Sequence, residues 1–235
     1  MKIIDPATGK RIDGKGANEL DLQKLKHTDP LQREVEKEIN ASEHSPMDPP
    51  DAYGGTVIDA VAYDELHPLV QRYMTEHRKA EEMIDRFEQA MARFKDTRYR
   101  LDESINNDFR EFFTYFDDKV LDHNRREERQ LFPLLHQRLV QSGERSTGPE
   151  PTTAVDLMED DHVKFIQLGA LAFNLLGLAA RLPDQRSAVF TYDAAFDAAR
   201  ELTEALRLHI HREDSILFPL AHKLLEREEL DRINT

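Results

Sequence analysis

The chain has 235 residues, of which 39% are hydrophobic and 33% charged, which is enough for one sizeable domain with an appendage. No signal-peptide core opens the sequence and no apolar run approaches the roughly 20 residues that span a bilayer, so we expect a soluble, cytoplasmic protein without a membrane partner. The absence of cysteine excludes disulfides, thiolate metal sites, iron–sulfur clusters and cysteine nucleophiles. A net charge of −14 argues against nucleic-acid binding. The ten histidines are the unusual feature of this composition.

The first 60 residues differ from the rest of the chain. Five of the nine glycines and five of the eleven prolines fall within residues 1–55, and residues 45–50 read Ser-Pro-Met-Asp-Pro-Pro. Leucines between positions 20 and 31 make at best a short amphipathic helix, which Pro30 interrupts. We predict an irregular N-terminal extension or linker over residues 1–60; the alternative is a segment that docks on a partner.

The remainder, residues 61–231, has a helical period. Apolar residues recur at three- and four-residue steps in four successive stretches, which are separated by short loops at 96–100, 142–151 and 182–186. This pattern predicts an all-α fold, an antiparallel up-down four-helix bundle made of two tandem helical hairpins. Each apolar stripe carries a histidine where a core aliphatic residue is expected, and two stripes also carry a glutamate: His77; His123 with Glu127; His162; and His209 with Glu213.

An internal repeat relates these residues. Residues 123–139 read HNRREERQLFPLLHQRL and residues 209–225 read HIHREDSILFPLAHKLL, so nine of seventeen positions match at an offset of 86. His77 and His162 are 85 residues apart. Each predicted hairpin therefore supplies one histidine from its first helix and a His-x-x-x-Glu pair from its second.

The repeat predicts a dinuclear metal site. Residues i and i+4 lie on one face of a helix, about 6 Å apart, so each His-x-x-x-Glu pair sends an imidazole and a carboxylate into the same space. Two hairpins related by a pseudo-twofold axis bring four imidazoles and two carboxylates into the core, where an unpaired carboxylate is costly. Bridging carboxylates leave each metal open positions for an oxo or hydroxo bridge and an outside ligand, which suits iron or manganese better than a closed zinc site. The predicted metal ligands are His77, His123, Glu127, His162, His209 and Glu213.

These residues also carry a family resemblance. The two His-x-x-x-Glu pairs, each followed by Leu-Phe-Pro at 131–133 and 217–219, together with His77 and His162, resemble the hemerythrin-like (HHE cation-binding) domain family over roughly residues 64–230. The resemblance implies a non-haem di-iron centre that binds O2, NO or peroxide. Oxygen-carrying hemerythrins place a second histidine four residues after the one in the third helix, where this chain has Ile166, so reversible oxygen carriage is not expected. The pattern is nearer to the repair-of-iron-centres proteins, but the cysteine segment of those proteins is absent here.

The function predicted on this resemblance is the binding or reduction of a small diatomic or peroxide ligand by a sensor or scavenger with two iron ions. Manganese and zinc are less favoured. One alternative is a di-iron enzyme or iron donor, with peroxidase-like activity or a role in repair of iron centres, so the sequence leaves open whether the chain is an enzyme. The other alternative is iron storage or a partner-binding bundle. A homodimer is one assembly to test.

Several other residues are predicted to lie outside the metal centre. Glu81 follows His77 by four residues but has no counterpart in the repeat, so we predict a flanking charge. Tyr73 is predicted to be a packing residue, with a hydrogen bond to a metal-bound oxygen as the less favoured alternative. The acidic run 159–161 is predicted to be a solvated helix face, with a carboxylate that accepts an imidazole N–H as the less favoured alternative. Pro133 and Pro219 are predicted to kink or end their helices, and the adjoining Leu-Phe pairs to plug one end of the bundle. The remaining histidines fail on distance along the helix, on direction, or because they belong to the extension: His136, His222, His67, His211, His27 and His44.

Overall fold

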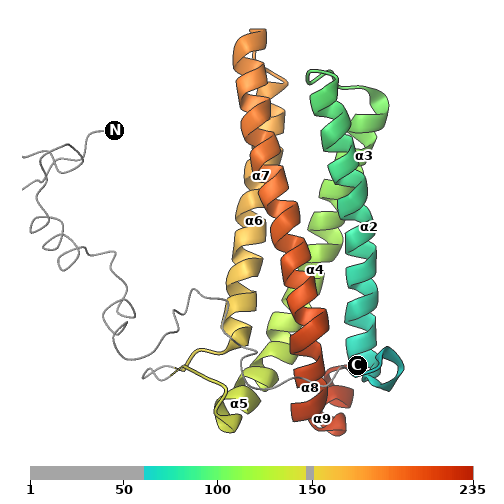
Figure 1. Cartoon of the computed structure of the whole chain (residues 1–235), viewed down its shortest axis with the longest axis vertical. Coiled ribbons are helices and arrows are strands. Elements are labelled where there is room, and N and C mark those ends of the chain that lie inside the picture. The colour runs from blue at the N-terminus through green and yellow to red at the C-terminus, as the bar shows by residue number, and fades with distance from the viewer. Residues whose placement is uncertain (1–60, 147–150, 235) are drawn as a thin grey trace, which may run out of the picture. The chain divides into compact units, whose positions relative to one another are not determined.

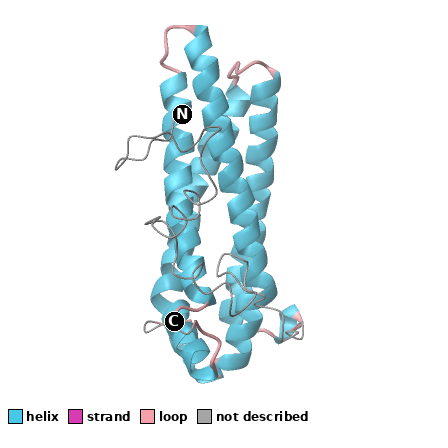
Figure 2. Ribbon diagram, turned by 60° about the vertical axis from the view of Figure 1, so that its left-hand side comes forward, coloured by secondary structure: helices cyan, strands magenta, loops and turns pink. Residues whose placement is uncertain are grey.

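The computed structural model describes residues 61–146 and 151–234, so the predicted extension over residues 1–60 lies outside the described residues. Within the described ranges the chain is helical and contains no strand (Figure 2). The predicted all-α, antiparallel four-helix bundle is confirmed (Figure 1). Its four arms are α2 (Pro68–Asp96); α3 (Glu103–Tyr115) continuing through α4 (Leu121–Arg126) and α5 (Phe132–Ser142); α6 (Ala154–Ala179); and α7 (Gln185–Arg212) continuing into α8 (Phe218–Leu224). A short 3-10 turn, η2 (Tyr63–Glu65), precedes the bundle and a short helix, α9 (Arg227–Ile233), follows it.

The helix ends follow from local sequence. The Asp102 carboxylate accepts a hydrogen bond from the Ile105 backbone N–H at 2.8 Å, which caps α3. Thr153 and Asp156 form a reciprocal capping box at the start of α6, and Asp184 caps α7. Gly143 ends α5 with a φ of 92°, a left-handed conformation that glycine adopts without strain. These caps set the lengths of the connections at 97–102, 143–153 and 180–184.

Three π-helical turns interrupt the second and fourth arms: η3 (Phe116–Val120), η4 (Glu127–Leu131) and η5 (Glu213–Leu217). The turns η4 and η5 occupy equivalent positions of the internal repeat, and each begins at one of the predicted glutamate ligands. The sequence predicts that Pro133 and Pro219 kink or end their helices. Neither proline ends a helix, because each is the second residue of a helix that directly follows a π turn, and the kink stays a prediction. A proline lacks the N–H of the regular helical ladder, and a π turn is where that ladder is already interrupted.

Two apolar clusters fill the bundle, one on each side of a polar layer. One cluster contains the rings of Phe87, Phe112 and Phe165 and runs toward the α2–α3 and α6–α7 connections. The other surrounds Tyr73 and contains the Leu-Phe pairs of both repeats, which therefore plug that end as predicted. On every arm, the predicted metal ligands lie between the residues of these two clusters.

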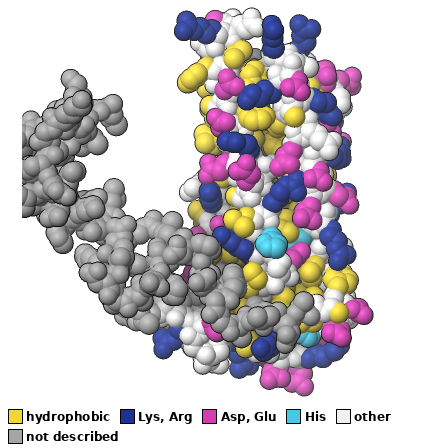
Figure 3. All heavy atoms as spheres, in the orientation of Figure 1, with side chains coloured by type: hydrophobic (Ala, Val, Ile, Leu, Met, Phe, Trp, Pro, Cys, Tyr) yellow, Lys and Arg dark blue, Asp and Glu magenta, His cyan; other side chains and the backbone are white. Residues whose placement is uncertain are grey.

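Helix α6 is apolar on its outer face as well as its inner one. Val163, Ile166 and Phe173 are 54%, 52% and 58% exposed. By length and composition alone α6 could span a membrane, with a mean hydropathy of 1.3 over a window that is only 28% buried. The expectation that no apolar run approaches such a length is thereby corrected, because the charged residues of α6 are confined to positions 156–164 and the rest of the helix carries none. Elsewhere, side chains of both charges are interspersed over the face of the bundle that Figure 3 shows.

Candidate metal centre

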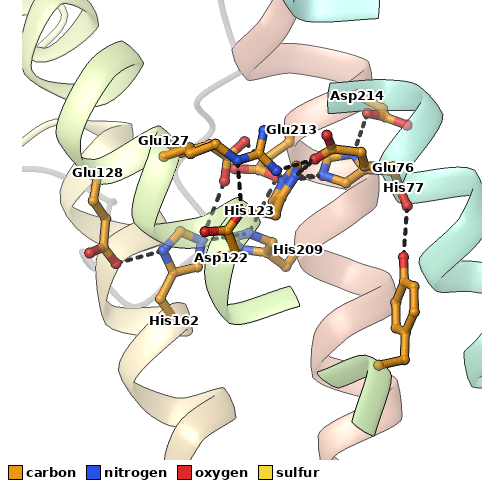
Figure 4. Close-up of polar contacts among 12 residues, drawn as sticks. Glu76, His77, Asp122, His123, Glu127, Glu128, His162, His209, Glu213 and Asp214 are labelled. Carbon is orange, nitrogen blue, oxygen red and sulfur yellow. Dashed lines mark hydrogen bonds and ion pairs between the residues drawn. The ribbon is translucent and has the colours of Figure 1, made fainter. Parts of the chain in front are cut away.

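The structure brings all six predicted ligands into one buried layer at mid-bundle (Figure 4). None of the four histidines is more than 6% exposed, and both glutamates are fully buried. Each comes from a different element or turn: His77 from α2, His123 from α4, Glu127 from η4, His162 from α6, His209 from α7 and Glu213 from η5.

The six residues form two groups that share both glutamates. One group is His77 and His123 with the two glutamates, and the other is His162 and His209 with the same two glutamates; in each group the potential ligand atoms lie within 4.8 Å of one another. The Nε2 atoms of His77 and His123 are 3.0 Å apart, and those of His162 and His209 are 3.1 Å apart. This arrangement assigns one histidine pair to each hairpin, a pairing that the sequence left open.

The glutamate oxygens lie between the two histidine pairs. Glu127 places Oε1 3.2 Å from His123 Nε2 and Oε2 3.8 Å from His162 Nε2. Glu213 Oε2 is 3.2 Å from His77 Nε2 and 3.3 Å from His209 Nε2. Each carboxylate therefore faces one imidazole from each hairpin, which is the position that a bridging ligand requires.

A carboxylate backs each of the four imidazoles on its far side. Glu76 Oε2 is 2.7 Å from His123 Nδ1, and Asp214 Oδ1 is 2.7 Å from His77 Nδ1. Glu128 Oε1 lies 2.8 Å from the Nδ1 of His162, and Asp161 Oδ2 lies 3.4 Å from that of His209. A carboxylate that accepts the Nδ1 proton leaves Nε2 free to face a metal and fixes the orientation of the ring.

The four backing carboxylates follow the internal repeat. Glu76 and Asp161 each precede a histidine of the first and third arms, whereas Glu128 and Asp214 each follow a shared glutamate. The repeat also supplies an arginine behind two of them. Arg126 Nη2 is 2.6 Å from Glu76 Oε2, and its counterpart Arg212 places Nη1 3.3 Å from Asp161 Oδ2.

Sequence reasoning missed Glu76, Glu128 and Asp214 as backing residues. It favoured a solvated face for the acidic run 159–161 over a carboxylate that accepts an imidazole N–H, but Asp161 is bonded to His209 on another helix. The repeat itself could have identified them, because acidic residues recur at 76 and 161 and at 128 and 214.

In the metal-free chain, carboxylates raise the pKa of three of the four imidazoles despite their burial: His77, His209 and, through Glu127 and Glu76, His123. Burial opposes the charge on His77, but bonds to Asp214 and Glu213 raise its pKa to about 10. Burial likewise opposes the charge on His209, while the Glu213 charge and the bond to Asp161 raise its pKa to about 9. The positive charges of His209 and His77 keep the pKa of Glu213 well below its usual value despite its burial. Burial and then the nearby His209 lower the pKa of His162.

The donor set fits a metal pair. None of the four oxygens of Glu127 and Glu213 accepts a well-directed hydrogen bond, although both side chains are fully buried. Leaving buried carboxylates unsatisfied is costly, and cations between the carboxylates and the imidazoles would satisfy them. Neighbouring ligands at right angles on a metal, each about 2.1 Å away, lie about 3.0 Å apart. The observed separations of 3.0–3.3 Å between most of the facing ligand atoms match that value.

The residues predicted to lie outside the centre do so. Glu81 is exposed and belongs to neither group. Tyr73 is fully buried with its ring centroid 5.1 Å from that of His123, and its O–H reaches no acceptor among the described residues. Burial and the Glu127 charge raise its pKa to about 12. The other described histidines bond elsewhere or lie in a helix end: His67 to Asp231 and the Leu69 N–H, His136 to Thr153, His211 to Ser215, and His222 in the last turn of α8. His27 and His44 lie outside the described residues.

A cavity of about 850 Å³ opens beside the centre. It lies between α2 and the η3–α4 segment and reaches His77, His123 and His209. Ile166, at the position where oxygen carriers have a further histidine, is half exposed on the outer face of α6 and adds no donor. This cavity therefore connects the centre to solvent on the side of His77 and His123.

Comparison with known proteins identifies the class. The family model of the hemerythrin HHE cation binding domain matches residues 69–221, which include nearly the whole of the four arms and all six predicted ligands. The chain belongs to this family. No curated protein and no solved structure matches it. The buried histidine and glutamate groups fit the cation site that the family name describes. The role of the six residues as metal ligands stays a prediction.

Proposed function

We propose that the chain is a di-iron protein that binds or reduces a small ligand, O2, NO or peroxide, as a sensor or scavenger. The observation that carries the proposal is the sharing of two fully buried glutamates between two histidine pairs. A shared carboxylate pair holds two cations close together, and two close, redox-active cations suit two-electron chemistry. Two bound irons would supply the electrons and open coordination positions for such a ligand.

The donor set supports iron over zinc. The four imidazoles and two carboxylates offer only nitrogen and oxygen, and the chain has no cysteine. Each group of two histidines and two shared glutamates leaves room for further ligands around an ion that prefers more than four. A structural zinc ion is satisfied by four ligands and needs neither sharing nor an adjoining cavity.

The chain's own residues perform three tasks in this proposal. Glu76, Glu128, Asp161 and Asp214 keep each imidazole turned with Nε2 toward the centre. The apolar clusters on both sides exclude water from the ligand layer. The cavity admits a ligand on the side of His77 and His123. Because the cavity lets a ligand reach the metal positions, it favours a centre that reacts with or senses a ligand. An iron store needs a passage only for the ions themselves.

Metal analysis and rapid mixing test the proposal. The purified chain should contain about two irons, absorb in the near-ultraviolet when oxidised, and oxidise rapidly when the reduced form is mixed with O2 in a stopped-flow instrument. Zinc in place of iron, without such absorption, would contradict a redox function. A long-lived oxygenated spectrum that reverts under argon would favour oxygen carriage instead.

A further inference from the structure

The cavity beside the metal centre is much larger than a diatomic molecule or hydrogen peroxide requires. Its volume is about 850 Å³, whereas a water molecule takes about 30 Å³ in the liquid. Sites for organic ligands have volumes of about 300–1,000 Å³. The cavity is therefore large enough to hold an organic molecule next to the imidazoles.

The inner wall of the cavity is apolar. Phe165 from α6 and Leu206 and Ile210 from α7 form the back, and Ala80 and Val120 line the sides. All of these except Val120 are buried. The buried polar groups that line the cavity are the imidazoles of the centre and the amide of Asn124, whose nitrogen has no hydrogen-bond partner among the described residues. An apolar wall favours a hydrocarbon over ordered water.

The mouth of the cavity carries unpaired positive charge. Lys119 lies exposed on η3 and forms no ion pair with any residue in the described ranges, and Arg72 lines the same cavity from α2. The two carboxylates at the mouth are already occupied, since Arg126 bonds to both Glu76 and Asp122. In a chain with a net charge of −14, a mouth with free cations is a local exception.

We propose that this cavity binds an organic amphiphile with one anionic head group, such as a carboxylate with an aliphatic chain. The head pairs with Lys119 at the mouth, and the chain lies against Phe165, Leu206 and Ile210 beside the imidazoles. This proposal rests on the proposed function only for the presence of metal next to the ligand. It identifies the class of organic molecule that the centre meets.

Calorimetric titration of the purified full-length chain tests the proposal, with its metal content measured on the same sample. Decanoate should bind at about one molecule per chain, whereas acetate, which lacks the chain, and decyltrimethylammonium, which has the opposite charge, should not. Val120→Trp should weaken decanoate binding, because the larger indole takes up part of the cavity at a residue that lines it. Lys119→Glu should weaken it roughly three- to tenfold, the range for reversing an exposed charge pair.

Two variants serve as matched controls. Lys119→Arg keeps the charge at the mouth and should bind decanoate as the unchanged chain does. Lys223→Glu makes the same charge change on the exposed surface of α8, away from the cavity, and should have no effect. Equal losses in Lys119→Glu and Lys223→Glu, equal binding of the cationic probe, or no decanoate binding would overturn the proposal. If the protein contains iron and reacts with O2 but does not bind decanoate, only the amphiphile proposal is overturned. If the protein binds decanoate but contains no iron, only the di-iron function is contradicted.

Discussion

Replacing Glu127 with glutamine tests the shared-ligand arrangement directly. The carboxylate lies 3.2 Å from His123 Nε2 and 3.8 Å from His162 Nε2, so it belongs to both histidine pairs. An amide is neutral and offers only one oxygen, so E127Q cannot bridge two cations as the carboxylate does. We expect the metal content to fall from about two per chain to one or none, with both sites weakened together.

Glu76→Gln should weaken metal binding at one site only, in contrast to E127Q. Glu76 contacts only His123 among the predicted ligands. Loss of such a backing carboxylate costs about 10- to 100-fold in metal affinity, or about 1.4–2.7 kcal/mol, and only at one site. The second metal should remain bound as in the unchanged chain.

Equilibrium dialysis against a graded chelator, followed by metal analysis, measures both variants. Glu81→Gln is the matched control, because Glu81 also follows a histidine by four residues but is exposed. It should retain both metals. One metal held as tightly in E127Q as in the unchanged chain would refute the shared-ligand reasoning, and equal effects of E127Q and E76Q would refute the difference between the two roles.

Four further predictions concern the pH dependence of stability, proton release on metal binding, the buried tyrosine and assembly. The pKa values of His77 and His209 in the metal-free fold, about 10 and about 9, exceed the unfolded value of about 6.5. Their protonation therefore stabilises the fold fully below pH about 6.5, and this contribution is lost as the pH rises through 9 to 10. Metal-free protein should melt at a lower temperature at pH 10 than at pH 7. Identical melting curves at the two pH values would contradict this. Metal binding near neutral pH should release protons to a pH indicator, and no release would show that the imidazoles are not the ligands. The buried O–H of Tyr73 reaches no acceptor among the described residues, and a proton-donating role for it is tested by Tyr73→Phe. With such a role, the variant should consume peroxide at least about tenfold more slowly at unchanged metal content. An unchanged rate makes Tyr73 a packing residue. If a second copy covers the exposed face of α6, Ile166→Glu should turn a dimer into a monomer in sedimentation velocity, and an unchanged chain that is monomeric at every concentration contradicts the homodimer.

The bundle and the six central residues could be predicted because both depend on periodicity. A helical stripe fixes which residues face inward, and the repeat at an offset of 86 separates His123 and His209 from histidines that share their composition but not their spacing. The same symmetry excluded Glu81, which the structure places on the surface.

Contacts between helices and departures from the regular helix could not be predicted in this way. The bond from Asp161 to His209 joins two arms, so the spacing along either helix says nothing about it. The π turns before Pro133 and Pro219 let the helices continue where propensity alone ends them. The size of the cavity depends on how α2 packs against the η3–α4 segment, which no one-helix pattern contains.

Because bonds cross between the hairpins, the layer of metal ligands is complete only when both hairpins are in place. Glu128 of the first hairpin backs His162 of the second, and Asp214 of the second backs His77 of the first. Either hairpin alone possesses only two imidazoles and one of the shared carboxylates, and one of its rings lacks the partner that orients it. Neither hairpin therefore presents a complete group of two oriented imidazoles and two carboxylates by itself, so a chain truncated before the fourth arm should lack the centre altogether rather than keep half of it.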